Sequence, residues 1–386
     1  MFIPMCSIVE VGKNGGTDDA IQGEWNTTDK HDVAAIFYTS GTIGKRKGVM
    51  LSQENMMEDI NFGAKNISSD GNTLSVLPFH HTFGLLTGLF ALFYYECTIF
   101  ICSSIKNLKR DMLAASPKMI MAVPIFIESF YKTIRQTALQ QGKEQKMRIA
   151  IAISNFLLRI GVDIRKCLFS SILARFGGKL EYIVCGGAPL QVKYIRVFRA
   201  IGIEILNAYG ITECSPGVAI SRNFYHKDGS VGQIIKGCVV RIQNSEIQVQ
   251  GKNVMLGYYQ DEVGSMEAFV DGWFKTGDLG YVDRDGFLYV TGRTKNLIIL
   301  SNGENVSPEE LENLLLDYDQ VKEVVVYAEN GAITAEVFPS LDEGFEEQIQ
   351  NVVDVCNRKL PAYKRIQRLK IRQTEFPKTT TQKIKR

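Results

Sequence analysis

The chain lacks any pair of cysteines at the spacing of a metal or redox motif. Its eight cysteines are scattered, none forms a Cys-X-X-Cys pair, and none lies near a histidine at zinc spacing. The first residues also lack the basic segment and long apolar run of a secretory signal. Scattered cysteines without such a signal predict free thiols in a reducing, cytoplasmic interior.

An excess of charge of either sign is absent too. The 44 Lys and Arg residues nearly balance 42 Asp and Glu residues, which leaves a net charge of +2. This balance gives no reason to expect a nucleic acid as partner. The 386 residues, 45% of them hydrophobic, suffice for two or three domains with their own cores.

Two segments raise the question of a membrane. The apolar run 83–102 approaches the length of a membrane span, but it holds Glu96 and ends in β-branched and aromatic residues. A buried helix followed by a buried strand is the favoured interpretation. Segment 140–176 is basic and amphipathic, which predicts a surface helical insertion, with a peripheral contact to a membrane surface as the alternative.

Up to about residue 210, apolar strands alternate with helical patterns, and Ser52 is a suitable N-cap for one helix. This alternation predicts an α/β domain in which helices cover a sheet. The segment 34–38 reads as a buried strand. The other predicted strands are 73–77, 98–102, 118–122, 182–185 and 203–207.

The pattern changes in the second half of the chain. Between 231 and 291, short alternating strands and Gly-containing turns predict a small antiparallel β subdomain. Beyond it, Ser307 to Glu310 form a capping box with proline at the first helical position. A helix to about Leu316, strands 323–327 and 333–338 and a helix 346–359 would make a small α+β lid domain. We set the boundary at 294–296, which gives domains 1–294 and 295–386.

The segment 38–49 is the first with chemical content. Glycine and hydroxyl residues after a strand let backbone N–H groups close around phosphates. It is not the P-loop of common ATPases, because only two residues separate Gly41 from Gly44 and Arg46 follows Lys45. A flexible hairpin is the alternative interpretation.

Further signals lie later in the chain. Tyr209, at the end of a predicted strand, can stack on a purine, since open α/β sheets bind ligands at that edge. Glu213 is a candidate Mg²⁺ ligand, because a carboxylate beside phosphates is costly unless it holds a cation. Asp278 suits ribose hydroxyls and Arg293 suits a phosphate or ribose contact. Taken alone, each of these patterns, and the basic tail 377–386, is more often an ordinary turn, surface arginine or disordered end.

Together, in this order and at these separations, the signals resemble the adenylate-forming superfamily of acyl-CoA synthetases, luciferases and peptide-synthetase adenylation domains. The resemblance runs from residue 34 to the end. Segment 77–84 is similar to the family's histidine motif, 186–189 to its adenine-flanking loop, and 304–310 to the start of its C-terminal domain. The helical insertion and the segment 297–306 are most similar to bacterial long-chain fatty acyl-CoA ligases.

The resemblance implies ATP, Mg²⁺, coenzyme A and a small-molecule carboxylate, most simply a fatty acid, as ligands. Lys383, Thr212 and Glu213 would be catalytic, and Glu213 and Thr39 would hold the metal. His81 and Gly303 would line substrate sites, and Lys295 would be the hinge between the domains. The implied nucleotide-binding residues are Thr39, Ser40, Gly41, Thr42, Gly44, Lys45, Lys47, Gly187, Ala188, Pro189, Asn207, Tyr209, Gly210, Thr212, Asp278, Arg293 and Lys383.

The implied reaction joins the carboxylate to the α-phosphate of ATP, releases pyrophosphate and then passes the acyl group to the thiol of coenzyme A. Two alternatives stay open: loading of a carrier-protein thiol, and a nucleotide-binding relative without activity. The sequence departs from the family where Gln382 replaces the usual glycine before Lys383. The phosphate loop also begins at residue 38, so much of the family's N-terminal region is absent, which predicts an open sheet edge and exposed apolar surface.

Overall fold

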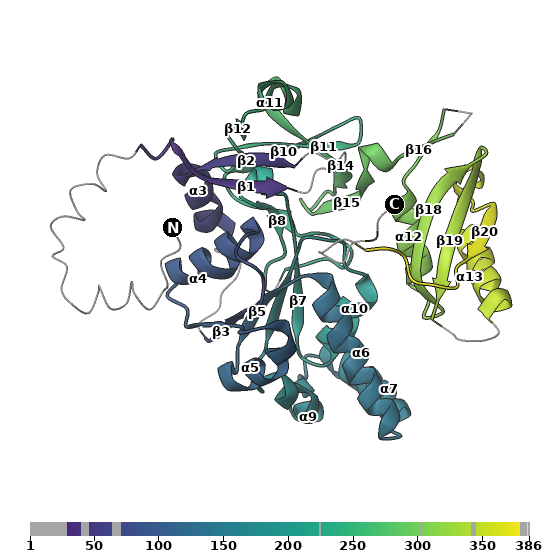
Figure 1. Ribbon diagram of the computed structural model, residues 1–386. Helices are drawn as coiled ribbons and strands as arrows, with labels where there is room; N and C mark the ends of the chain where they lie inside the picture. The colour runs from purple at the N-terminus through teal and green to yellow at the C-terminus, as the bar shows by residue number, and fades with distance from the viewer. Residues whose placement is uncertain are drawn as a thin grey trace, which may run out of the picture.

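The computed structural model describes residues 29–39, 46–63, 71–223, 225–300, 303–340, 345–378 and 384 (Figure 1). The predicted α/β class is confirmed. The largest sheet has seven strands in the order β4-β3-β5-β6-β7-β8-β9, of which the first five are parallel. Their bounds are β3 (Thr73–Ser75), β4 (Ile99–Ile101), β5 (Met119–Ala122), β6 (Tyr182–Cys185), β7 (Glu204–Gly210), β8 (Gly217–Ile220) and β9 (Gln233–Ile234).

Strands β5 and β6, in the middle of this sheet, are apolar, as expected for strands that helices cover. All of Met119–Ala122 is buried, which is typical of a parallel strand with both faces packed. Leu74, Ile120 and Ile205 pack with Phe198 in one core cluster. The helices around the sheet are α3 (Gln53–Gly63), α5 (Leu108–Ala115), α6 (Pro124–Gln140) and α10 (Val192–Ala200). The predicted cap of α3 is confirmed, since the Ser52 hydroxyl accepts from Asn55 N at 3.1 Å.

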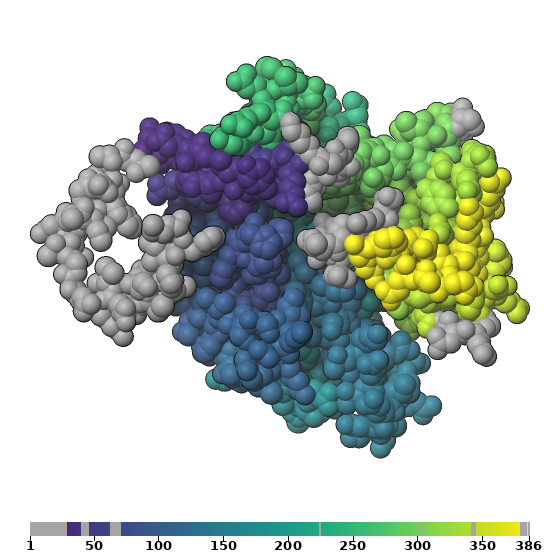
Figure 2. All heavy atoms as spheres, viewed as in Figure 1, coloured from purple at the N-terminus to yellow at the C-terminus, as the bar shows by residue number. Residues whose placement is uncertain are grey.

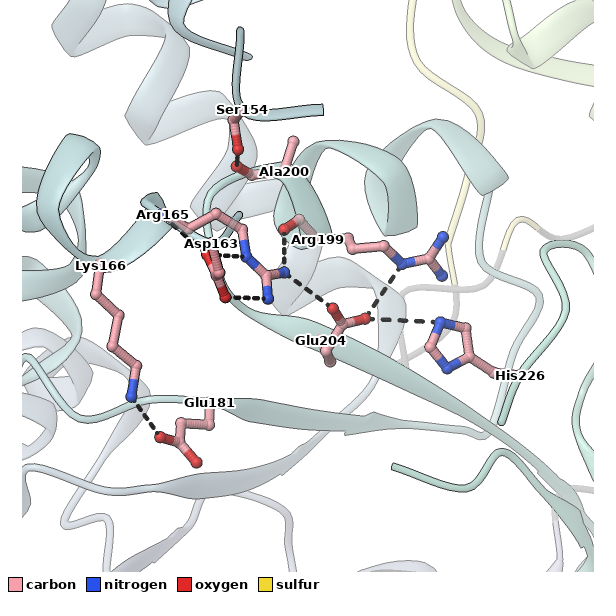
Figure 3. Close-up of polar contacts among 9 residues, drawn as sticks. All are labelled: Ser154, Asp163, Arg165, Lys166, Glu181, Arg199, Ala200, Glu204 and His226. Atoms are coloured by element: carbon pink, nitrogen blue, oxygen red, sulfur yellow. Dashed lines mark hydrogen bonds and ion pairs between the residues drawn. The ribbon is translucent and has the colours of Figure 1, made fainter. Parts of the chain in front are cut away.

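The predicted helical insertion is confirmed as helices α7 (Glu144–Arg159), α8 (Arg165–Leu168) and α9 (Ser170–Leu173). Two polar anchors tie it to the domain (Figure 3). Ser154 donates to the carbonyl of Ala200 at 2.9 Å, and the Arg165 guanidinium donates to the carbonyl of Arg199 at 2.9 Å. The insertion is therefore a docked surface element.

Two strands predicted to be buried are largely exposed. Strand β1 (Val33–Thr39) pairs with β2 (Lys47–Ser52) at the edge of a three-stranded sheet that β12 (Gly257–Tyr258) completes. Most of its side chains are exposed, among them Tyr38. The prediction for 34–38 was right about the strand and wrong about its burial, because an edge strand with one uncovered face cannot be recognised from apolar composition.

The run 83–102 also departs from the prediction in burial. It forms a π-helix η2 (Phe83–Phe90), helix α4 (Ala91–Tyr94) and strand β4, as a helix followed by a strand. However, β4 is an edge strand of the seven-stranded sheet, and Phe93 and Ile101 are exposed. The exposed apolar surface and open edge expected for this domain are therefore present in the described residues. Among those residues, no helix has both the length and the apolarity to cross a membrane.

The predicted antiparallel subdomain is confirmed as a five-stranded sheet. Strand β14 (Trp273–Val282) is its centre and pairs with β11 (Glu246–Gly251), β13 (Phe269–Val270) and β15 (Leu288–Arg293). Strand β10 (Cys238–Gln243) pairs with β11, and the short helix α11 (Glu262–Ala268) precedes β13. After β15 the chain passes through a single 3₁₀ turn, η6 (Thr294–Asn296).

The C-terminal residues form the predicted small α+β unit. Helices α12 (Pro308–Leu316) and α13 (Phe345–Lys359) accompany strands β18 (Val321–Glu329), β19 (Ala332–Pro339) and β20 (Arg368–Ile371), preceded by the hairpin β16 (Ile298–Ile299) and β17 (Asn305–Val306). The helix from Pro308 is confirmed, but the capping box is wrong. The Ser307 hydroxyl donates to the carbonyl of Thr291 at 2.8 Å, so it fastens the helix to β15 instead of capping it.

Candidate active site

The carboxyl end of β7 opens into the turn that carries two candidate catalytic residues. The 3₁₀ turn η5 (Thr212–Cys214) follows β7, and the chain returns as β8. The turn is closed by Ile211 N donating to the Pro216 carbonyl at 2.9 Å. A Cβ at Gly210 would lie 2.0 Å from that same carbonyl oxygen, so only glycine fits there. This tight turn fixes Thr212 and Glu213 just beyond the edge of the sheet.

Tyr209, Asp278 and Arg293 come together as predicted. The Tyr209 hydroxyl donates to Asp278 Oδ2 at 2.7 Å, and Arg293 Nε lies 2.7 Å from Asp278 Oδ1. Asp278 and Arg293 face each other in the β14–β15 register, which explains their ion pair. Burial, and then the neighbouring Asp278 carboxylate, raises the pKa of the Tyr209 hydroxyl well above its usual value. A buried carboxylate with fixed donors on both oxygens results.

Glu213 is linked to the β1–β2 hairpin through a tyrosine that the sequence did not single out. The Tyr258 hydroxyl donates to Glu213 Oε1 at 3.0 Å. On the ring of the same tyrosine, the Lys47 ammonium lies 4.3 Å from the ring centroid, as a cation–π contact. Burial, and then Glu213, raises the pKa of Tyr258. The structure thus brings Lys47 and Glu213 to one residue, Tyr258.

Two polar side chains hold the backbone around the Glu213 turn through hydrogen bonds. Asp59, buried in α3, accepts from Gly217 N at 2.9 Å, and burial raises its pKa well above the usual value. Asn253 donates to the carbonyl oxygens of Cys214 and Gly217 at 3.0 and 2.7 Å. Sequence reasoning missed both residues, because an isolated Asp or Asn in the chain carries no sign of the turn it supports.

The predicted adenine loop leaves the sheet beside Tyr209. Strands β6 and β7 pair with Cys185 opposite Asn207, so residues Gly187, Ala188 and Pro189 follow β6 at the same edge. Asn207 donates to the carbonyl of Ser230 at 3.0 Å, which ties β7 to the segment before β9.

The remaining predicted residues are spread over several segments. Thr39 ends β1, where its hydroxyl donates to the carbonyl of Lys47 at 3.4 Å. His81 is exposed just before η2, with its ring centroid 4.2 Å from that of His80. Gly303 lies between β16 and β17 with φ +83°, and Lys295 lies in η6. The predictions for Ser40, Gly41, Thr42, Gly44, Lys45 and Lys383 lie outside the described residues.

The donor set around Glu213 fits Mg²⁺. Magnesium prefers oxygen ligands and takes few carboxylates, keeping water and phosphate oxygens in the other positions. Glu213 is a half-buried carboxylate, and its described hydrogen-bond donor, Tyr258, is neutral. The Thr39 hydroxyl donates its proton to the carbonyl of Lys47, and its oxygen can still act as an acceptor. Both predicted metal ligands are therefore chemically suitable.

Comparison with known proteins decides the family. The sequence pattern of the AMP-binding enzyme family matches residues 9–259, and that of the AMP-binding enzyme C-terminal domain matches residues 295–386. The chain belongs to the AMP-binding enzyme family. The resemblance drawn from the sequence motifs is confirmed.

Among its relatives, this AMP-binding enzyme is 34% identical over 334 residues to the long-chain-fatty-acid–CoA ligase FadD15 of Mycobacterium tuberculosis, covering 82% of the chain and 55% of that protein. It is 28% identical over 372 residues to the 2-succinylbenzoate–CoA ligase of Listeria innocua, covering 93% of the chain and 70% of that ligase. The chain thus spans about half the length of the long-chain ligase.

Solved structures agree with the fold. The o-succinylbenzoate CoA synthetase (MenE) of Bacillus subtilis in complex with ATP and a magnesium ion matches with a TM-score of 0.70 and 26% identity, over 92% of this chain and 69% of that one. The same synthetase with its acyl-adenylate intermediate matches with a TM-score of 0.71 and 26% identity, over 92% and 68% of the two chains.

Proposed function

We propose that this AMP-binding enzyme activates a carboxylic acid with ATP to an acyl-adenylate, releases pyrophosphate and transfers the acyl group to coenzyme A. The observation that carries the proposal is the pair of carboxylates near the carboxyl end of β7, one bonded to Tyr209 of that strand and the other in the turn that follows it. Asp278 is fixed by Tyr209 and Arg293 at 2.7 Å each, and Glu213 stands on the neighbouring turn with a neutral partner. One carboxylate suits a sugar and the other a metal ion.

We assign the roles from this geometry. Asp278 would accept the ribose hydroxyls, with Arg293 holding its second oxygen, and the ring of Tyr209 would lie along the base beside Gly187 to Pro189. Glu213 and Thr39 would hold Mg²⁺, which would neutralise phosphate charge. Thr212 and the hairpin residues up to Lys47 would contact the phosphates. Lys383 would bridge the carboxylate and the α-phosphate, as positioning and charge neutralisation dominate such reactions.

We also propose that the chain divides at 294–296 into domains 1–294 and 295–386, with Lys295 at the hinge. The single 3₁₀ turn between β15 and β16 supports this, since a short turn can absorb a change in backbone angles. Movement about the hinge would withdraw Lys383 after adenylation and admit the thiol, keeping the reactive anhydride from water. Gly303 would line the channel of coenzyme A, and His81 the acyl pocket.

For the acid, we favour a fatty acid in a cytoplasmic enzyme, because the long-chain ligases are 34–35% identical to this chain. The second candidate is an aromatic acid of the 2-succinylbenzoate kind. The Listeria ligase favours it by matching 93% of the chain, although at 28% identity. The alternatives for the acceptor are coenzyme A and a carrier-protein thiol.

ATP–pyrophosphate exchange tests the proposal. The full chain is assayed with fatty acids of several lengths and with 2-succinylbenzoate, beside Lys383→Ala. We expect exchange with fatty acids that the variant lacks, followed by thioester formation with coenzyme A. Exchange only with 2-succinylbenzoate would move the enzyme to the second acid class. Thermal stabilisation by ATP without exchange would instead support an inactive nucleotide-binding relative.

A further inference from the structure

Helix α7 carries an apolar stripe on its outward face. Ile149, Ile153, Phe156 and Ile160 are 59%, 47%, 63% and 60% exposed. The spacing of four and three residues places Ile149, Ile153 and Phe156 on one face of α7, and Ile160 is the C-cap residue that follows its last turn. Scattered exposed apolar residues are ordinary, but a continuous stripe of branched and aromatic side chains along one helix indicates a binding surface.

The stripe is exposed although the helix is firmly docked. Ser154, on the opposite face, is buried and donates to the carbonyl of Ala200 at 2.9 Å. Met147, Ala150 and Ile151 pack against the core cluster beneath the sheet. The inward face of α7 is therefore packed and hydrogen-bonded against the domain. Turning the helix to bury the stripe would break these contacts.

Basic residues flank the stripe on both sides. At 3.6 residues per turn, Lys146 lies on one side of it, and Arg148 and Arg159 lie on the other. Arg148 forms an i,i+4 pair with Glu144 at 3.0 Å, and its side chain is 71% exposed. The whole segment 140–176 holds seven basic and two acidic residues, while the entire chain has a net charge of only +2. Positive charge is thus concentrated around the stripe.

The position of the helix leaves the stripe accessible. Helices α6 and α7 form a hairpin that projects from the lower end of the molecule in Figure 1, and the space-filling view in Figure 2 shows the same end as a protrusion. At the tip of the hairpin, Leu139 is exposed as well.

We propose that the outward face of α7 docks onto an anionic lipid surface. The four apolar side chains would enter the boundary between headgroups and acyl chains, and Lys146 and Arg159 would meet the lipid phosphates on either side. A second copy of this chain fits the face less well, because a symmetric contact would bring the two basic segments together. The backbone of the helix is already hydrogen-bonded internally, so insertion exposes no unsatisfied polar group.

Vesicle flotation of the full chain tests the proposal. Phosphatidylcholine vesicles with and without phosphatidylglycerol are compared, at low and high salt. We expect binding to the anionic vesicles only, weakened by salt. The Ile153→Glu/Phe156→Glu variant is expected to lower the partition coefficient at least about tenfold, and Lys146→Gln or Arg159→Gln about fivefold each, since a basic residue near an anionic surface contributes about 1 kcal/mol.

The matched control is Val263→Glu/Met266→Glu on α11, where the two side chains are 63% and 70% exposed. This variant carries the same added charge away from the stripe and should bind like the wild type. Equal binding of the wild type and the Ile153/Phe156 variant would overturn the proposal. So would a concentration-dependent dimer in sedimentation that the Ile153/Phe156 variant loses while neither protein binds vesicles, because the stripe would then join two copies. Circular dichroism of each variant verifies that the fold is retained.

Discussion

Strand β7 has a carboxylate near each of its ends: Glu204 begins it, and Glu213 follows it in the turn η5. At the first end, Glu204 Oε1 accepts from Arg165 at 3.1 Å and Oε2 accepts from Arg199 at 3.2 Å, with His226 Nε2 at 3.7 Å (Figure 3). At the other end, Glu213 accepts from the neutral Tyr258 hydroxyl at 3.0 Å.

The two carboxylates differ in their partners: Glu204 has two arginines, and Glu213 has a neutral tyrosine. Two arginines balance the charge of Glu204 and fill both of its oxygens, so that end ties α8 and α10 to the sheet. Among the described residues, Glu213 forms no salt bridge within 4.0 Å, although it is half-buried. This difference supports the proposal that Glu213, which has no cationic partner among the described residues, holds a metal ion.

The largest expected effect is on activity, which should distinguish the Glu213 end of β7 from the Glu204 end. Glu213→Gln should lower ATP–pyrophosphate exchange at least about 100-fold, because the amide carries no charge for a metal ion. Glu204→Gln, the same change at the other end, should leave exchange within about threefold, since it touches no substrate. Exchange rates at saturating ATP and Mg²⁺ measure both. Equal losses of exchange activity in the two variants would contradict different roles for the two carboxylates.

The free energy of unfolding should depend on the Glu204 end of β7. Glu204→Gln removes one carboxylate from Arg165 and Arg199, which keep Asp163 and Asp228 as their other partners. The loss of two charge-assisted hydrogen bonds should lower the free energy of unfolding by about 2 kcal/mol. The matched control is Glu181→Gln, which breaks a pair with Lys166 at 2.8 Å, whose side chain is 77% exposed, and a longer contact with Lys118 at 3.7 Å. That change should cost at most about 1 kcal/mol. Urea unfolding compares them, and equal costs would contradict a structural role specific to Glu204.

A smaller effect is expected at the Asp278 cluster, where Asp278 of β14 meets Tyr209 near the carboxyl end of β7. Tyr209→Phe keeps the ring and removes the 2.7 Å hydrogen bond to Asp278. The loss of about 1 kcal/mol in positioning should raise the KM for ATP about fivefold with little change in kcat. Tyr281→Phe, at an exposed position of the same sheet, is the control. A lower melting temperature with an unchanged KM would mean that the hydroxyl only stabilises the fold.

Local sequence patterns predicted elements that form the candidate site. Strand β6 has the predicted bounds, 182–185, because an apolar run between turn residues is a local signal. The motif resemblance predicted that Tyr209, Asp278 and Arg293 share a site, and the structure brings them together. The burial of β1 was wrong because edge position depends on the order of strands in the sheet, which no local pattern encodes.

The sequence analysis missed the residues that support Glu213 because their contacts, too, depend on long-range strand pairing. Tyr258 reaches Glu213 only because β12 pairs with β2, more than two hundred residues earlier in the chain. Asp59 and Asn253 act on the Glu213 turn from α3 and from the turn after β11. Ser307 had the spacing of a cap, but the carbonyl of Thr291 competed for its hydroxyl. Long-range pairing thus decides how a recognised motif is held.

The smallest expected effect concerns Asp59, the buried carboxyl beneath the Glu213 turn. Burial raises its pKa well above the usual value, so the folded protein holds a proton there that the unfolded chain releases near its ordinary pKa. Its contribution to stability is therefore complete below the ordinary Asp range and is lost as the pH rises through the folded pKa.

Asp59→Asn removes this titration and keeps an oxygen that can accept from Gly217 N. Relative to the wild type, the variant should gain stability as the pH rises from 4 to 8, by about 1 kcal/mol across that range. Melting temperatures of both proteins along this pH series measure the difference. Asp283→Asn, at a partly buried position paired with Lys227, should not show the same gain. Parallel curves for the wild type and Asp59→Asn would mean that the folded protein holds no extra proton at Asp59.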